Sequence, residues 1–418
     1  MTAAGTSATA RTVEAVWRME SARLIGALLR SVSDLGLAED LAQDALLAAL
    51  EQWPQTGVPD NPGAWLMAVA KRRAVDRVRR EITLERKIAE MGRDLPTGVD
   101  PVDDAEFDRH VTDDVLRLMF TACHPVLAPE ARVALTLKTV AGLRTEEIAR
   151  AFVVSTPTMA ARITRAKKAL AAANVPFEVP VGEELDGRLE SVLEAVYLLF
   201  NEGYTATAGS AWARPEVCAE AMRLGRMLAA FAPMSAQSLG LVALMEIQAS
   251  RLLARVSPSG EPVTLLDQDR TRWDRLLITH ALDCLSRALA LDARATYVLQ
   301  AAIAACHARA AVAEDTDWTA IAALYGVLVE VTGSPIVELN RAVAVAMADG
   351  PQAGLAVVDG LADVPALREY HLLPSVRGDL LEKLGRFGEA KVEFERAAGL
   401  TGNETEQALL LARAAACG

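Results

Sequence analysis

The segment PEARVALTLKTVAGLRTEEIARAFVVSTPTMAARITRAKKAL, residues 129–170, carries the clearest structural signal in this 418-residue chain. Its apolar spacing predicts helices over 129–142, 143–152 and 156–170, with a turn at 153–155 between the last two. Two helices joined by so short a turn are typical of the helix-turn-helix class. Elsewhere apolar residues also recur at three- and four-residue steps, and β-branched alternation is rare. The whole chain is therefore predicted to be all-α.

The last helix of this segment has two distinct faces. The residues expected to face the core share a helical spacing: Met159, Ile163, Ala166 and Leu170. The residues left on the outer face are polar or basic: Thr158, Arg162, Arg165 and Lys168. Ser155 or Thr156 can cap the helix, and Pro157 suits its first turn. Such a face fits a DNA major groove, although a basic helix face that is merely solvated is the alternative.

Charge is distributed unevenly along the chain. The formal net charge is −12, from 43 basic and 55 acidic residues. Residues 1–172 contain 23 of each sign, so the excess of acid lies entirely in 173–418. Within the first part, 71–80 holds six basic residues and one acid, and 94–108 holds six acids and no base. A second basic cluster comprises Arg162, Arg165, Lys167 and Lys168. Two basic patches thus flank an acidic segment, which is predicted to be a flexible linker.

Composition limits the class of protein. No run approaches the roughly 20 apolar residues that a membrane span needs, and residues 1–10 lack a secretory pattern. The five cysteines are scattered without CxxC spacing. We expect a cytoplasmic protein with reduced thiols and no membrane contact. Turn residues at 52–62 and 96–101 indicate joints between helical segments.

Residues 11–172 resemble the extracytoplasmic-function group of the sigma-70 superfamily, on three motifs in order. The first is LAEDLAQDALLAALEQW, residues 37–53. In the family this segment binds the β′ clamp helices of RNA polymerase, which implies contacts through Asp40, Gln43 and Asp44. The alternative is an ordinary amphipathic helix with an inward stripe of Leu41, Ala45 and Ala49.

The second motif is NPGAWLMAVAKRRAVDRVRRE, residues 61–81, which resembles the region that melts promoter DNA and reads the −10 element. Trp65 and Leu66 match the apolar anchor of that region, although a tryptophan here is also typical of a core position. The charged pattern that the resemblance assigns to −10 DNA comprises Lys71, Arg72, Arg73, Asp76, Arg79 and Arg80. Many family members have asparagine in place of Arg72. Basic side chains suit melted DNA because its phosphates stay charged while its bases are exposed.

The third motif is the helix-turn-helix, which reads the −35 element in the family. The matching outward positions are Thr158, Arg162, Arg165 and Lys168. An arginine there pairs with guanine edges or with phosphates, and the sequence does not separate these roles. The resemblance implies two partners, promoter DNA and core RNA polymerase, the latter contacted through its β′ clamp helices and β flap. It assigns 11–82 to sigma region 2, 83–109 to an acidic linker and 110–173 to sigma region 4.

Residues 185–418 resemble a tetratricopeptide-type α-solenoid. The segment LEKLGRFGEAKVEFERAAGL, residues 381–400, follows the helix, glycine turn, helix pattern of that repeat, and a less regular pair covers 339–361. Such solenoids bind proteins or peptides on a concave surface. Residues 189–207 resemble a segment of the sigma subgroup that carries such an extension. We therefore expect this part to regulate or support the activity of the first part.

Signals for chemistry are weak. Cys123 with His124 and Cys306 with His307 are isolated pairs without the spacing of a zinc site. We predict no catalytic residue, no metal and no cofactor, and thus no enzyme. A rival interpretation is a one-component transcription regulator, in which the solenoid senses a ligand or peptide and the helix-turn-helix binds an operator. A pure protein scaffold leaves both basic clusters unexplained.

Overall fold

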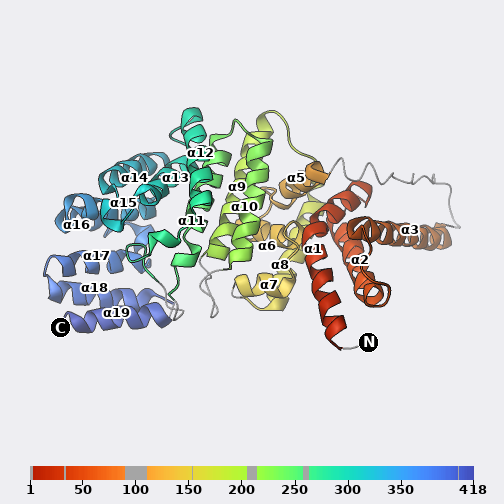
Figure 1. Ribbon diagram of the computed structural model, residues 1–418, viewed down its shortest axis with the longest axis horizontal. Helices are drawn as coiled ribbons and strands as arrows, with labels where there is room; N and C mark the ends of the chain where they lie inside the picture. Colours follow the sequence, from red (N-terminus) through yellow and green to blue (C-terminus); the bar gives the residue numbers. More distant parts are fainter. Residues whose placement is uncertain are drawn as a thin grey trace. The chain divides into compact units, whose positions relative to one another are not determined.

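The computed structural model describes residues 3–32, 34–89, 111–152, 154–204, 214–257, 263–402 and 404–418. Within these ranges the side chains of residues 3–11, 76–89, 111–113, 150–151 and 404–405 are not described. The described residues form helices and no β-strand, which confirms the all-α prediction (Figure 1). The chain divides into two compact units, residues 1–224 and 225–418. Most of the predicted linker, residues 90–109, lies outside the described residues.

The described residues of the first unit form eight α-helices and the start of a further one that continues into the second unit. Their bounds are α1 Ala3–Val32, α2 Leu35–Thr56, α3 Pro62–Ala89, α5 Val111–Ala122, α6 Pro129–Thr139, α7 Thr145–Ala151, α8 Thr156–Ala172, α9 Glu183–Tyr204 and α10 Pro215–Phe231. Helix α1 packs along α2, and both contact α3. Helix α1 also packs against α5, and α6 and α5 pack against α9.

The helix-turn-helix forms where the sequence predicts it. Helix α6 ends at Thr139, three residues before the predicted bound, and Gly142 then adopts the left-handed region with φ of 67°. Helices α7 and α8 follow. The Ser155 hydroxyl accepts a hydrogen bond from the Thr158 amide at 3.3 Å, so Ser155 is the N-cap. The four residues predicted to face the core are all buried: Met159, Ile163, Ala166 and Leu170.

The second unit is a succession of helices that pack against their neighbours in sequence. Their bounds are α11 Ala236–Ala249, α12 Arg275–Leu291, α13 Thr296–Arg309, α14 Trp318–Thr332, α15 Pro335–Asp349, α16 Pro351–Asp359, α17 Leu372–Lys383, α18 Phe387–Leu400 and α19 Glu404–Ala416. Helices α17, α18 and α19 lie side by side in Figure 1 and contact one another in that order.

Two glycines make the turns that the repeat pattern anticipated. Gly385, with φ of 75°, joins α17 to α18, and Gly350, with φ of 97°, joins α15 to α16. Both angles favour glycine because a Cβ atom is strained there. Buried side chains from these helices form one apolar core, which includes Leu381 and Phe394. The helix pairs are thus present, while their assignment as tetratricopeptide repeats stays a prediction.

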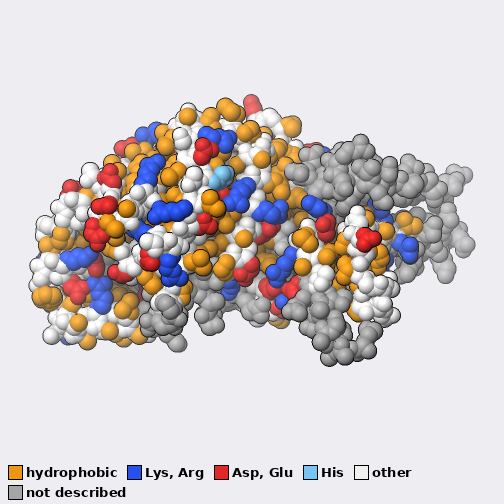
Figure 2. Space-filling model, in the orientation of Figure 1, with side chains coloured by type: hydrophobic (Ala, Val, Ile, Leu, Met, Phe, Trp, Pro, Cys, Tyr) orange, Lys and Arg blue, Asp and Glu red, His pale blue; other side chains and the backbone are white. Residues whose placement is uncertain are grey.

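The surface is mixed in character. Figure 2 shows basic, acidic and apolar side chains interspersed on the visible face of the described part. None of the helices in the described part combines the length and the apolar character that crossing a bilayer requires.

Candidate nucleic-acid and polymerase interface

Helix α2 carries the three residues predicted to contact the polymerase. Asp40 is exposed, and Gln43 and Asp44 are half-buried. The inward stripe of Leu41, Ala45 and Ala49 is fully buried. The amphipathic packing and the outward polar face therefore coexist on one helix, and the first does not argue against the second. Asp34 caps the helix by accepting a hydrogen bond from the Leu37 amide at 2.6 Å.

Helix α3 holds the predicted −10 region. Its Trp65 is half-buried and meets Trp53 of α2 edge to face, with ring centroids 5.3 Å apart. Leu66 is buried, so the apolar anchor joins the core of this helix group. The Arg73 guanidinium lies 3.2 Å from the Asp44 carboxylate, which links the predicted −10 region to the predicted polymerase face. Of the remaining predicted residues, Lys71 is half-buried and Arg72 exposed, and the side chains of Asp76, Arg79 and Arg80 lie outside the described ones.

Helix α8 presents the predicted −35 face. Thr158, Arg165 and Lys168 are exposed. Arg162 is half-buried, and its guanidinium lies over the Phe152 ring at 5.6 Å from the centroid. This contact joins α8 to the residue that follows α7. Arg162 is therefore partly covered, whereas the other three side chains are exposed.

A buried carboxylate that the sequence reading missed lies between α2 and the helix-turn-helix. Glu39 is only 2% exposed. Its carboxylate forms an ion pair with Lys167 of α8 and lies 3.6 Å from the Lys138 ammonium of α6. The Gln43 amide donates a hydrogen bond of 2.6 Å to the same carboxylate. We call these four residues the Glu39 cluster. The sequence contains a signal for this buried position. Glu39 lies four residues after Leu35 and about one turn before Ala42, so helical periodicity places it on the apolar face of α2.

A second set of contacts joins α1 to the helix-turn-helix unit. Asp114 of α5 is buried, and its carboxylate lies 3.2 Å from Arg30 of α1 and 3.3 Å from Arg117. A Cβ atom on Gly26 would lie 3.0 Å from the Asp114 Cβ atom, so the two helices touch at a glycine. Nearer the N-terminus of α1, Arg18 lies 3.6 Å from Glu147 of α7.

Helix α9 is built into the helix-turn-helix unit. Arg188 is 5% exposed and donates a hydrogen bond of 3.0 Å to the Phe120 carbonyl of α5. The Ser191 hydroxyl donates one of 2.5 Å to the Cys123 carbonyl. One turn on, Glu194 forms an ion pair of 2.9 Å with Arg132 of α6. We call these contacts the α9 junction.

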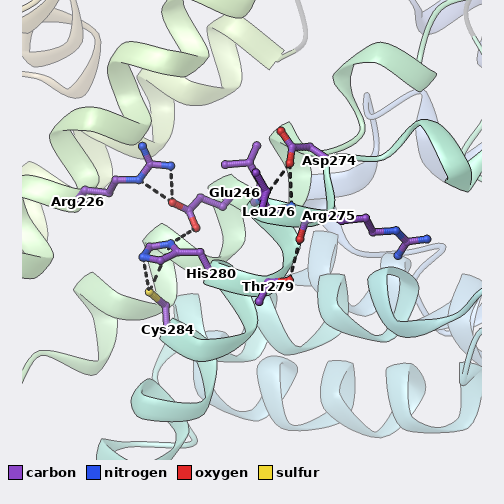
Figure 3. Close-up of polar contacts among 9 residues, drawn as sticks. Arg226, Glu246, Asp274, Arg275, Leu276, Thr279, His280 and Cys284 are labelled. Carbon is purple, nitrogen blue, oxygen red and sulfur yellow. Dashed lines mark hydrogen bonds and ion pairs between the residues drawn. The ribbon is translucent and has the colours of Figure 1, made fainter.

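The second unit contains a polar cluster around Glu246 of α11 (Figure 3). Glu246 is fully buried, and Arg226 approaches one of its oxygens at 2.6 Å. His280 of α12 approaches the other oxygen at 2.5 Å and lies about one helical turn from Cys284. Burial raises the pKa of the Cys284 thiol, and the nearby Glu246 carboxylate adds to the effect. The thiol is therefore protonated at neutral pH, which makes it a poor nucleophile.

The two cysteine–histidine pairs, Cys123 with His124 and Cys306 with His307, belong to different units of the chain. Burial raises the pKa of the Cys123 thiol to about 11, against a hydrogen bond to Thr136 that lowers it. Burial lowers the pKa of His307 to about 4, with Arg251 and Arg270 adding to the effect. Within the described part of the chain, no three histidine, cysteine, aspartate or glutamate side chains are grouped as metal ligands.

Comparison with protein families assigns most of the first unit. Residues 17–82 match sigma-70 region 2, which covers α2, most of α3 and the second half of α1. Residues 117–170 match sigma-70 region 4, which contains the helix-turn-helix. Residues 188–289 match a family of unknown function, DUF6596, and this match includes the Glu246 cluster.

Individual relatives include two proteins that are named as sigma factors. An uncharacterized protein of Rhizobium meliloti is 43% identical over 92% of this chain and 91% of its own length. The probable ECF RNA polymerase sigma factor SigI of Mycobacterium tuberculosis is 32% identical, over 33% of this chain and 47% of that protein. The ECF RNA polymerase sigma factor SigK of Mycobacterium bovis is 30% identical, over 35% of this chain and 78% of that protein. The chain therefore belongs to the extracytoplasmic-function family of RNA polymerase sigma factors, and it carries an additional helical part.

Proposed function

We propose that this protein is a transcription initiation factor that binds core RNA polymerase and directs it to specific promoters. The polar face of α2, with Asp40, Gln43 and Asp44, docks on the β′ clamp helices. The basic segment of α3 then captures the opened −10 strand, and α8 reads the −35 element. The protein acts in the cytoplasm, where its polymerase is, and region 4 contacts the β flap.

The main observation in support of this proposal is the two-faced structure of α8. A capped helix buries one apolar stripe and exposes Thr158, Arg165 and Lys168 on the opposite side, within a match to sigma region 4. This arrangement fixes the helix on its domain and leaves the side chains of Arg165 and Lys168 exposed, where base edges and phosphates can meet them. The acidic excess of residues 173–418 is repelled by DNA phosphates, so promoter contact is confined to the first part.

The helical part after α8 regulates or supports initiation in this proposal. Its paired helices resemble solenoids that bind proteins or peptides, and its match to DUF6596 brings no function with it. The partner is a protein or peptide ligand rather than DNA.

Run-off transcription with core polymerase tests the proposal. We expect the chain to confer start-site selection on core enzyme. Lys168→Gln removes a phosphate contact and should lower the yield by several-fold, with a weaker dependence on salt. Arg223→Gln is the matched control, because Arg223 is an exposed cation of α10 paired with Glu220. It should leave the yield unchanged.

The rival function, a one-component regulator, predicts a different result in the same assay. Such a regulator binds duplex DNA as the isolated protein and confers no start site. Failure to bind core polymerase, together with specific DNA binding in a gel-shift without polymerase, would favour that rival over our proposal.

A further inference from the structure

We propose that the outer face of α19 is a self-association surface, through which two copies of the chain form an antiparallel pair with two-fold symmetry. This inference goes beyond the proposed function, because it assigns a surface that promoter recognition does not use. It concerns the helices α17, α18 and α19 of the second unit and the same helices of a second copy.

Helix α19 has one covered face and one bare apolar face. Leu410, Ala414 and Cys417 are buried and belong to the apolar core of this part. On the opposite side two leucines are exposed, Leu409 at 62% and Leu411 at 49%. Among the exposed side chains of residues 407–418 none is charged. We call the apolar ones the α19 face, which comprises Ala408, Leu409, Leu411, Ala412, Ala415 and Ala416.

The neighbouring helix shows the contrast with a side that faces solvent. Exposed positions of α18 include the charged Glu389 and Arg396. The one cation in α19, Arg413, turns inward, because its guanidinium lies 4.4 Å from the Phe394 centroid and 2.8 Å from the Asp379 carboxylate. Figure 1 shows α19 as the outermost of the stacked helices α17, α18 and α19. In such a stack an apolar outer face is normally covered by a further helix.

The chemistry of the α19 face restricts the partner. An uncharged face has nothing to offer to phosphates or to a strongly charged protein surface, so its partner must be apolar as well. The α19 face of a second copy meets this condition, and no like charges oppose the approach. Pairs in which one patch meets itself across a two-fold axis are the commonest oligomers of soluble proteins.

An antiparallel register places large residues opposite small ones. With the two-fold axis between Leu411 and Ala412, Leu411 of each copy packs against Ala412 of the other. In the same register Ala408 of each copy lies opposite Ala415 of the other. The alanines let the two helix backbones approach closely, so that the exposed leucines can reach the facing helix.

The charges at the ends of α19 favour the same register. Glu406, with a side chain 34% exposed, lies in the first turn. Lys391 of α18 lies beside the other end, because its ammonium is 3.2 Å from the position of a Cβ atom on Gly418. Antiparallel pairing brings the acidic end of each α19 to the basic end of the other. It also places the helix dipoles in opposite directions, which is favourable.

The size of the face sets the strength of the pairing. Six residues a side are far fewer than the roughly 20–30 a side of a standard stable interface. We therefore expect a weak dimer, with a dissociation constant of about 10 µM.

Sedimentation velocity of the full chain over a range of concentrations tests the inference. With a dissociation constant of about 10 µM, the chain should be mostly monomeric at about 1 µM and mostly dimeric at about 100 µM. Ala412→Glu and Ala412→Lys each place two like charges beside the two-fold axis, so each should weaken the dimer by at least about ten-fold. An equal mixture of the two variants places opposite charges there and should restore the dimer.

Two further variants complete the experiment. Leu411→Gln keeps the length of the side chain and removes its apolar surface, so it should weaken the dimer by about five-fold. Ala356→Glu adds the same charge at an exposed alanine of α16 and is the matched control for Ala412→Glu. It should leave the dissociation constant unchanged. Circular dichroism and the melting temperature establish that each variant is folded.

Each outcome decides for or against the pairing. A chain that stays monomeric at about 100 µM would show that another molecule covers the α19 face, and the proposal would be wrong. A dimer that resists the folded Ala412 variants and Leu411→Gln would use a different surface, which also contradicts it. Failure of the mixture to restore the dimer would contradict the two-fold register. If the chain did not bind core polymerase, the proposed function would fail and the pairing would still stand.

Discussion

Region 4 has two neighbours in the first unit, and the two contacts differ in kind. Toward region 2 it offers lysines that enclose the single carboxylate of Glu39. Toward α9 it offers backbone carbonyls, which accept hydrogen bonds from the buried Arg188 and Ser191 side chains. Side-chain ion pairs can be replaced by a competing charged surface, whereas a carbonyl inside a folded helix has a fixed place. The contact between Glu39 and the lysines can therefore be broken by a competing charged surface, whereas we expect the hydrogen bonds between α9 and region 4 to persist.

This difference gives α9 a structural role. The sequence reading placed the end of region 4 at residue 173, and the compact unit continues through α9. We infer that α9 completes the region 4 core. Removal of the C-terminal part can therefore abolish activity because region 4 unfolds, without any loss of regulation.

The largest expected effect comes from truncation. A chain ending at residue 175 loses α9, and with it two buried hydrogen bonds at about 1 kcal/mol each and the apolar side chains that α9 buries, at about 1.5–3 kcal/mol each. We expect the melting temperature of region 4 to fall by more than about 10 °C. A chain ending at Phe231, after α10, retains α9 and should keep the melting temperature of the first unit.

Transcription by the same two chains separates the roles of the helical part. If the chain ending at 231 is active and the chain ending at 175 is not, α9 is needed for folding and the solenoid is dispensable. Equal melting temperatures for the two chains would contradict the permanent contact.

The thiol of Cys123 reports on the same junction. Burial raises its pKa to about 11, so at pH 8 about one thiol in a thousand is ionised. An exposed cysteine has a pKa of about 8.5, and about a quarter is ionised at that pH. Because reactivity follows the thiolate, alkylation of Cys123 by iodoacetamide should be at least about 100-fold faster in the chain ending at 175 than in the chain ending at 231. Peptide-level mass spectrometry measures Cys123 separately from Cys218. A slow, equal rate in both chains would mean that α9 does not protect this site.

The sequence predicted what depends on local periodicity. Met159 and Leu170 face the core as their spacing requires, and Ser155 is one of the two caps proposed. Motif resemblance identified regions 2 and 4, which family comparison confirms. The long-range partners could not be predicted, because Glu39 and Lys167 are 128 positions apart and nothing in the local pattern couples them. The same holds for Arg188, whose acceptor is a backbone carbonyl without a sequence signature.

The smallest effects come from two point variants of the α9 junction, which should differ from each other. Arg188→Met keeps the buried stem and removes the donor to the Phe120 carbonyl, which should cost about 2 kcal/mol, or about 4–8 °C in the melting temperature of the first unit. Glu194→Gln keeps an acceptor for Arg132 and removes a charge on a side chain that is 50% exposed, which should cost about 0.5 kcal/mol or less. Differential scanning calorimetry of the full chain measures both. The two residues lie on one helix and differ mainly in burial. Equal losses of stability would therefore mean that Arg188 contributes no more than an exposed ion pair, and they would contradict the proposed difference between the α9 junction and the Glu39 cluster.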